Sequence, residues 1–354
     1  MGYINNAPNP KLRWEKTRDV KVALDFGLWK DRINGIVEAY WRKSKDCVTS
    51  EYVPVTTGFF NQSYNTSVLQ NNGVEFSLSV AVLKSKDYNL SVSANVAWNQ
   101  NKLKKYNSPN TSLALDKYVG YPMGAVFSGK YEGIDPETGM YKFKLRPDAV
   151  TNKDGYLREP NNYYYYLGTS VAPFTGGFNL NFSYKNIGLS VGGSYSVKAK
   201  MVDNIESPAG YELLSGSKLE SIPTPHNDLY RNHLNVKREV RNRWTPENRT
   251  GVKYPRLIDA YGKKLGLDLT NPTLTTITRG ALLEDISYLR INTIALSYSL
   301  PQRVLERINF SSAALNLTLN NFFTITKYSG IAPEVPGATY PVSRSVTIGL
   351  NVGF

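Results

Sequence analysis

The sequence has 354 residues, of which 41% are hydrophobic, and it is rich in tyrosine (25) and glycine (27), a mixture that favours strands and turns over helices. This length permits a sizeable core, but no apolar run approaches the roughly 18 residues of a membrane-spanning helix, which argues against a helical membrane protein. The net charge of +13 falls mainly in connecting segments such as 101–106 and 236–244, so it indicates charged loops and not a nucleic-acid-binding stripe.

Apolar residues recur at every second position along several windows of about nine to eleven residues, which is the period of a strand. The first stripe runs from Val20 to Leu28, and the last from Val346 to Phe354. Near Leu289 the alternation changes phase, which predicts a β-bulge. Nine strands are predicted, at about 19–29, 33–46, 73–83, 88–100, 174–184, 189–198, 284–300, 310–327 and 343–354.

The connections between these predicted strands alternate in length. Short connections are expected at 29–33, 84–87, 185–188 and 301–309, and long ones at 47–72, 101–173, 199–282 and 328–342. Short turns on one rim and long loops on the other are typical of an outer-membrane barrel. A soluble β-sandwich also alternates apolar and polar residues, but its strands are usually about 5 to 6 residues long. We therefore expect an all-β fold, an antiparallel transmembrane β-barrel segment.

The last stripe ends on Phe354, which we expect to anchor the chain at the membrane interface, where aromatic residues form a girdle. With short turns on the periplasmic rim, the ninth strand would end in the periplasm. Nine is an odd number, whereas single-chain bacterial barrels have an even number of strands. The predicted barrel segment therefore looks incomplete.

Several stretches resemble the C-terminal part of SusC/RagA-type TonB-linked outer-membrane proteins of Bacteroidetes. The most specific are "SYLRINTIALSYSLP" (287–301) and "NNFFTITKYSGIAPEV" (320–335), whose order and spacing agree together. Similar stretches include "NPKLRWEKT" (9–17), "GIDPETG" (133–139) and "PFTGGFNLNFSYKNIGLSVGGSYS" (173–196). The resemblance covers nearly the whole chain and is weakest over 199–282, apart from "RWT" at 243–245.

The resemblance implies a 22-stranded barrel with an N-terminal plug domain and a TonB box read by the TonB–ExbB–ExbD complex. The plug and the TonB box have no counterpart here, and residues 1–354 carry no secretion signal, so we expect a C-terminal barrel region from a fragment or truncated gene product. The implied function is import of large nutrients, oligosaccharides or peptides, across the cell outer membrane with a SusD-like surface lipoprotein, in contact with lipid and lipopolysaccharide. A passive porin or adhesin barrel and a soluble β-sandwich carbohydrate-binding module remain as alternatives.

Candidate solute contacts are the consecutive Tyr163, Tyr164, Tyr165 and Tyr166, because aromatic rings can stack on sugar rings. The alternative for these residues is a structural role in a strand or girdle, since tyrosine is enriched at barrel interfaces. Trp244, in the "RWT" stretch, is grouped with them. Glu38 and Glu75 fall on the polar phase of their strands, so we expect both to face the wet lumen.

The sequence offers no pattern of an enzyme, a metal site or a cofactor site. His226 and His233 stand seven residues apart in a polar segment, which is not the spacing of a zinc protease. Relatives commonly carry a calcium-type Asp-x-Asn-x-Asp-Gly loop where this chain has "VTNKDG" (150–155), and Val150 at the first ligand position cannot bind Ca²⁺. We expect no metal, no cofactor and no catalytic residue.

Overall fold

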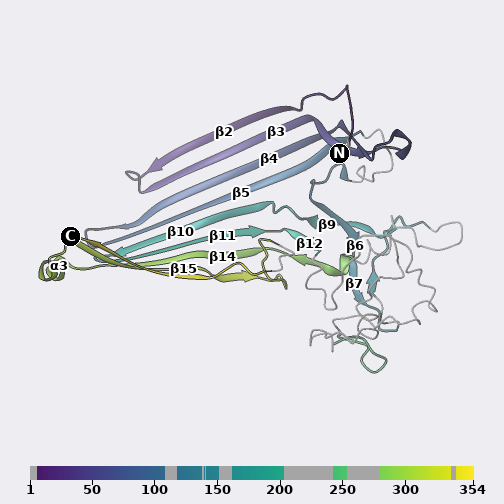
Figure 1. Cartoon of the computed structure of the whole chain (residues 1–354). Coiled ribbons are helices and arrows are strands. Elements are labelled where there is room, and N and C mark those ends of the chain that lie inside the picture. The colour runs from purple at the N-terminus through teal and green to yellow at the C-terminus, as the bar shows by residue number, and fades with distance from the viewer. Residues whose placement is uncertain are drawn as a thin grey trace.

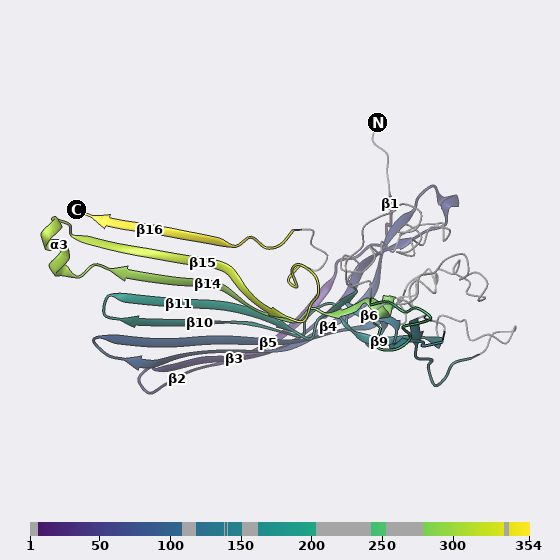
Figure 2. The same ribbon diagram turned by 90° about the horizontal axis from the view of Figure 1, so that it is seen from below.

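The computed structural model describes residues 6–107, 118–137, 139, 141–150, 162–202, 242–252, 279–335 and 340–354. Nine long antiparallel strands lie side by side in one sheet, in the order β16-β15-β14-β11-β10-β5-β4-β3-β2 (Figures 1 and 2). Their bounds are β2 Lys16–Leu28, β3 Ile33–Tyr52, β4 Asn61–Lys84, β5 Tyr88–Tyr106, β10 Phe174–Tyr184, β11 Ile187–Val197, β14 Tyr288–Ser299, β15 Ser312–Thr326 and β16 Ser345–Gly353. The nine predicted strands are therefore confirmed.

Smaller elements lie around this sheet. β1 (Asn6–Ala7) pairs in parallel with the start of β4, and three two-stranded ribbons form from short strands. The ribbons pair β6 (Ala125–Gly129) with β9 (Tyr164–Thr169), β7 (Tyr131–Ile134) with β8 (Tyr141–Phe143), and β12 (Lys200–Val202) with β13 (Leu283–Asp285). Within the described ranges the helical turns are η1 (Val55–Thr57), η7 (Arg279–Leu282) and α3 (Gln302–Ile308). Among the described residues, no helix has the length and apolarity needed to cross a membrane.

The register of the sheet sorts side chains by chemistry, because directly opposed residues of antiparallel strands lie on one face. One row of opposed residues crosses all nine strands and is entirely apolar: Leu28, Ile33, Val80, Val92, Leu180, Val191, Ile294, Leu319 and Val346. The adjacent row, on the other face, contains only polar residues and glycine: Gly27, Asn34, Ser79, Ser93, Asn179, Gly192, Thr293, Asn320 and Ser345. The sheet thus has one apolar face and one polar face.

The apolar face is left open by the described part of the chain. Val22, Leu24, Ile348 and Leu350 are each between 64% and 72% exposed, values that no residue of a packed core would have. A sheet with one fully exposed apolar face and one polar face is not stable in water alone. This face therefore requires a cover, and hydrocarbon chains fit its breadth and its lack of charge.

The predicted bulge lies where the alternation changes phase. β14 shifts register against β15 between Ile291 and Thr293, and against β11 between Gly192 and Gly193. Asn292 is the extra residue against β11, so Ile294 and Leu296 lie on the same face as Leu289 and Ile291 although the alternation changes phase. The prediction of a bulge is confirmed.

The two rims differ as predicted, with one correction. Short connections and the C-terminus lie at one end of the strands, and the longer connections lie at the other end (Figure 1). The expected long loop at 47–72 is wrong, because β3 continues to Tyr52 and β4 already begins at Asn61. Residues 48–52 pair with residues 61–65, so the turn of the β3–β4 hairpin lies much farther from the apolar stripes than predicted.

Candidate functional site

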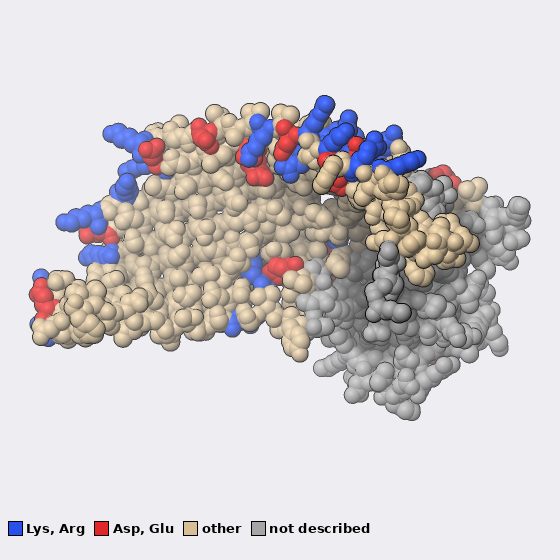
Figure 3. Space-filling view, turned by 45° about the horizontal axis from the view of Figure 1, so that its top comes forward, with Lys and Arg blue, Asp and Glu red and all other residues tan. Residues whose placement is uncertain are grey.

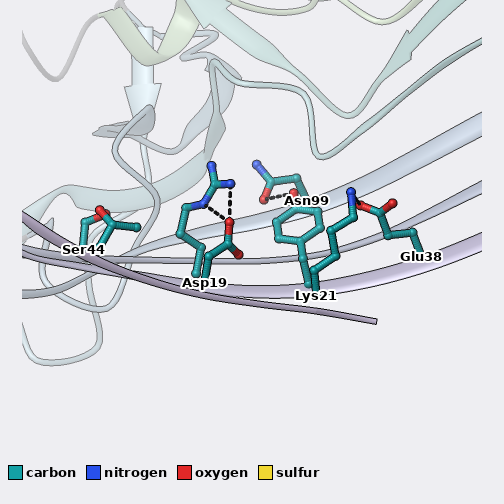
Figure 4. A network of polar contacts seen from close by, with 8 residues as sticks. Asp19, Lys21, Glu38, Ser44 and Asn99 are labelled. Atoms are coloured by element: carbon teal, nitrogen blue, oxygen red, sulfur yellow. Dashed lines mark hydrogen bonds and ion pairs between the residues drawn. The ribbon is translucent and has the colours of Figure 1, made fainter. Parts of the chain in front are cut away.

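Charged side chains form a ladder on the polar face of β2 and β3 (Figure 4). Arg42 and Asp19 are directly opposed and form an ion pair at 2.6 Å, and Lys21 forms a second ion pair with Glu38. Between Glu38 and Arg42 on β3, the hydroxyl of Tyr40 donates a hydrogen bond of 3.2 Å to Asn99 on β5. This ladder forms a charged strip along the β2 edge of the polar face.

Glu38 and Glu75 lie on this polar face, directly opposite each other on β3 and β4. Two carboxylates in opposed positions repel each other, and the ammonium group of Lys21 beside Glu38 offsets part of that repulsion. Figure 3 shows charged residues gathered along the upper edge and at the left end of the visible surface, with few in its broad middle. The arrangement suits a wet surface that contacts a polar molecule.

The rest of the polar face carries amides and hydroxyls that hydrogen-bond across strands. Ser190 pairs with Asn181 at 2.8 Å, and Asn320 accepts from Thr293 at 3.1 Å while donating to Ser345 at 3.0 Å. These contacts link β10 to β11, and β14 to β15 and β16. Because both partners are uncharged, this part of the face can exchange hydrogen bonds with a passing polar solute at little electrostatic cost.

The four consecutive tyrosines do not form one platform. β9 pairs with β6, and alternation along β9 places Tyr165 on the face opposite Tyr164 and Tyr166. The hydroxyl of Tyr165 donates to the carbonyl of Leu145 at 2.9 Å. Tyr163 precedes the strand and is half-buried, and burial raises the pKa of its hydroxyl. Of the four, Tyr166 presents the most surface to solvent, at 41% exposure.

Trp244 is buried, with 6% of its surface exposed. Its indole N–H donates to the carbonyl of Pro136 at 2.9 Å, which ties the 242–252 segment to the turn after β7. A solute could reach this ring only after that contact opened. His226, His233, Asn161 and residues 151–155 lie outside the described part of the chain.

Phe354 lies at the short-turn rim, where the C-terminus ends (Figure 1). Its ring is 92% exposed and meets Phe310 edge-on, with centroids 5.1 Å apart. Phe310 follows α3, so two aromatic rings stand together at this rim. Paired aromatic rings at the edge of an apolar band are typical of the girdle of a membrane barrel.

Sequence reasoning missed a buried ion pair between the two most family-specific stretches. Arg290 on β14 and Glu334 after β15 meet at 2.7 Å, with 10% and 19% of their side chains exposed. The Nε–H of Arg290 donates to Thr324 at 3.0 Å, and within the described residues neither carboxylate oxygen of Glu334 has a hydrogen-bond partner. The contact with Glu334 is therefore mainly one of charge. Only the arginine in "SYLRIN" and the glutamate in "APEV" could have signalled it.

The same segment is attached at two further places. The hydroxyl and backbone N–H of Ser329 both donate to the carboxylate of Glu284. Tyr328 packs in a small cluster with Ala199 and Ile286, and its ring is almost fully buried. Residues 327–335 are thus folded back onto the sheet instead of projecting from the rim. No group of three potential metal-ligating side chains occurs in the described ranges.

Comparison with known proteins relates the chain to outer-membrane receptors. No family model matches it. It is 25% identical to the TonB-dependent receptor P26 of Formosa agariphila and to the TonB-dependent receptor SusC of Bacteroides thetaiotaomicron, over 99% and 98% of its length. The solved RagAB peptide transporter matches over 99% of the chain with 27% identity and a TM-score of 0.75. The chain spans about a third of these relatives: 36%, 32% and 37% of their lengths.

These matches confirm the expected resemblance and fold. The nine-stranded sheet with its two faces matches part of the barrel of a TonB-dependent transporter in both topology and shape. The chain is SusC/RagA-like, and proteins of this kind lie in the outer membrane.

Proposed function

We propose that this chain, a SusC/RagA-like part of a TonB-dependent receptor barrel, forms the wall and outer loops of an importer of large nutrients in the outer membrane. The observation that carries the proposal is the pair of adjacent rows, one wholly apolar and one wholly polar, that crosses all nine strands. Such a sheet separates lipid from an aqueous lumen. The chain would act as part of a transporter and not as an enzyme.

The region 1–354 is proposed to be the C-terminal barrel region, and a plug domain and TonB box would belong to other parts of the whole receptor. Energy would come from the TonB–ExbB–ExbD complex through those parts. A SusD-like surface lipoprotein would cover the loop rim, and lipid and lipopolysaccharide would surround the apolar face. The solute would be an oligosaccharide or a peptide; one relative is named SusC, and another is described as a peptide transporter.

Within this proposal, the predicted site residues have distinct places. Glu38 and Glu75 would face the lumen and contact the plug or the solute. Phe354 would sit in the aromatic girdle at the periplasmic interface. Tyr163–Tyr166 and Trp244 lie among the outer loops, where a solute would first arrive.

The soluble sandwich is disfavoured by the packing of the described residues, since no second sheet covers the apolar face within them. A passive porin would share the two-faced wall and differ only in its energy source. Uptake measurements separate the two. Cells carrying the full receptor would be assayed with labelled oligosaccharides and labelled peptides, with and without TonB. Uptake that stops without TonB supports the proposal, and undiminished uptake would establish the porin.

The membrane orientation can be tested directly in the full receptor with Cys47 replaced by serine. Single cysteines at Ile348 and Thr347 would carry a nitroxide label, and the collisions of each label with oxygen and with a water-soluble nickel complex would be measured. Ile348 should report hydrocarbon and Thr347 water, because they lie on opposite faces of β16. Equal access of the nickel complex to both labels would refute the assignment of the apolar face to lipid.

A further inference from the structure

Four aromatic rings gather at the loop end of the barrel wall, around the β6–β9 ribbon. Phe127 and Tyr166 are opposed across the ribbon, with ring centroids 5.7 Å apart. Tyr121 meets Tyr166 at 4.9 Å and meets Phe127 nearly edge-on at 4.9 Å, and Tyr118 meets Phe127 edge-on at 5.2 Å. We call these four residues the aromatic cluster.

The backbone that carries the aromatic cluster is fixed before any ligand arrives. The N–H of Leu103, on the outward extension of β5, donates to the carbonyl of Tyr121 at 2.8 Å, and Asn101 accepts from the backbone of Met123 at 2.8 Å. Tyr166 is held by the β6–β9 ladder. A ligand would therefore spend little free energy on ordering these rings.

The aromatic cluster is not closed. Phe127 is half-buried, while Tyr121 is 36% exposed and Tyr166 is 41% exposed. The two exposed rings have centroids 4.9 Å apart and are inclined at 38°, so they pack against each other, and the part of each ring that stays exposed is an apolar surface with a hydroxyl group at its margin. Such a surface fits a flat molecule that is apolar on its faces and polar at its edge.

The charge of Arg146 is already balanced. Arg146 follows Leu145, whose carbonyl accepts from the hydroxyl of Tyr165 on β9, and its guanidinium group is bound by both oxygens of Asp148, at 2.8 and 2.7 Å. A second, acidic ligand would gain little from a cation that is neutralised in this way. The planar ion pair still offers hydrogen bonds at its edge, which favours an uncharged ligand rich in hydroxyl groups.

We propose that Tyr121 and Tyr166, supported by Phe127 and Tyr118, bind a neutral pyranose unit of an oligosaccharide at the outer end of the barrel. A C–H face of the sugar ring packs on the exposed part of Tyr121 and Tyr166, and the sugar hydroxyls meet the tyrosine hydroxyls. This inference rests on the proposed import function and narrows its solute to a carbohydrate.

The test uses the full receptor, purified in detergent. Binding is measured to a panel of neutral linear hexasaccharides of glucose, mannose, galactose and xylose, and to a pool of random octapeptides. At least one hexasaccharide should bind, and Tyr121→Ala and Tyr166→Ala should each weaken its binding by about tenfold or more, as for a central aromatic contact.

Two variants control for folding and for unspecific effects. Tyr166→Phe keeps the ring and should retain binding to within about threefold. Tyr131→Ala removes a similarly exposed ring that packs on Phe143 in the β7–β8 ribbon, outside the aromatic cluster, and should leave affinity unchanged. Thermal unfolding of each variant shows whether a loss of binding reflects a loss of fold.

The outcomes separate this inference from the import proposal. If a hexasaccharide binds native receptor and both alanine variants equally, the site is wrong while glycan import stands. If only octapeptides bind, the carbohydrate assignment is overturned and import of peptides remains. If neither class binds and TonB-dependent uptake is also absent, both proposals fail.

Discussion

Replacing Glu334 by glutamine removes the charge partner of Arg290, whose side chain is 90% buried. Arg290 would keep its hydrogen bond to Thr324 but would lose the carboxylate 2.7 Å away. Breaking a buried ion pair at one partner costs about 3 to 5 kcal/mol. Because Glu334 is 19% exposed, the lower end, about 3 kcal/mol, applies, and the population with segment 327–335 open should rise by about a hundredfold.

Hydrogen exchange followed by mass spectrometry on the full receptor measures this opening. The backbone N–H groups of Tyr328 and Ser329 are bonded to Thr326 and Glu284 in the closed segment, so they exchange only when it opens. The matched control is Asp19→Asn, which also removes one negative charge but breaks an exposed pair, and it should change stability by less than about 1 kcal/mol. Exchange in Glu334→Gln within about threefold of the native rate would refute the reasoning, since it would mean that the pair does not hold the segment.

Three further predictions concern the wall and its outer loops. Ile348→Arg should destabilise the membrane-inserted receptor by about 2 to 4 kcal/mol, whereas Thr347→Arg on the polar face should be tolerated; yields of folded, heat-modifiable receptor measure both, and equal yields would count against the facing. Gly193→Ala should lower the free energy of unfolding by about 1 to 3 kcal/mol, because its methyl group would lie 2.4 Å from a ring atom of Phe178. The methyl group of Gly349→Ala would meet no atom closer than 3.9 Å, so this variant should be near neutral. Denaturant unfolding in lipid vesicles compares the two variants, and a larger loss of stability at Gly349 would contradict the packing. The guanidinium group of Arg146 holds the pKa of the Asp148 carboxyl below its ordinary value, so the stabilisation is complete above about pH 4 and is lost as pH falls through the lowered pKa. In a pH titration followed by NMR, the chemical shift of the Asp148 carboxyl carbon should therefore stay constant from about pH 7 to pH 5. A titration midpoint above about pH 4 would exclude the ion pair.

The membrane part of the wall could be predicted because its two faces have opposite requirements. Hydrophobicity alternates with a period of two along the membrane part of every strand, and the break in that period marks the bulge at Asn292. The number and order of the strands follow from the same signal, since consecutive stripes joined by short turns become neighbours.

The extension of β3 and β4 beyond the membrane could not be predicted in this way. Residues 61–72 are mostly polar on both phases, with Val68 and Leu69 adjacent to each other and not alternating, so no stripe separates a strand from a loop. Pairing alone defines the strand in that region, and pairing has no local signature.

Contacts between segments that are distant in the sequence could not be predicted either. Arg290 and Glu334 each look like an ordinary surface charge, and only the fold-back of the 327–335 segment brings them together. Tyr166 stood out in the sequence as one of four tyrosines, but its partners Tyr121 and Phe127 come from other segments and gave no signal. The place of Tyr166 outside the nine long strands could be predicted, but the composition of the aromatic cluster could not.

The length of β4 determines how far from the membrane surface another molecule can bind. A strand of 24 residues measures about 80 Å, and with the usual barrel tilt its outer portion, residues 61–73, rises about 30 Å beyond an apolar band about 25 Å tall. That height exceeds the thickness of a layer of lipid headgroups. A bulky polymer or a second protein can therefore be engaged on the rim at a distance from the bilayer, with no need to approach its surface.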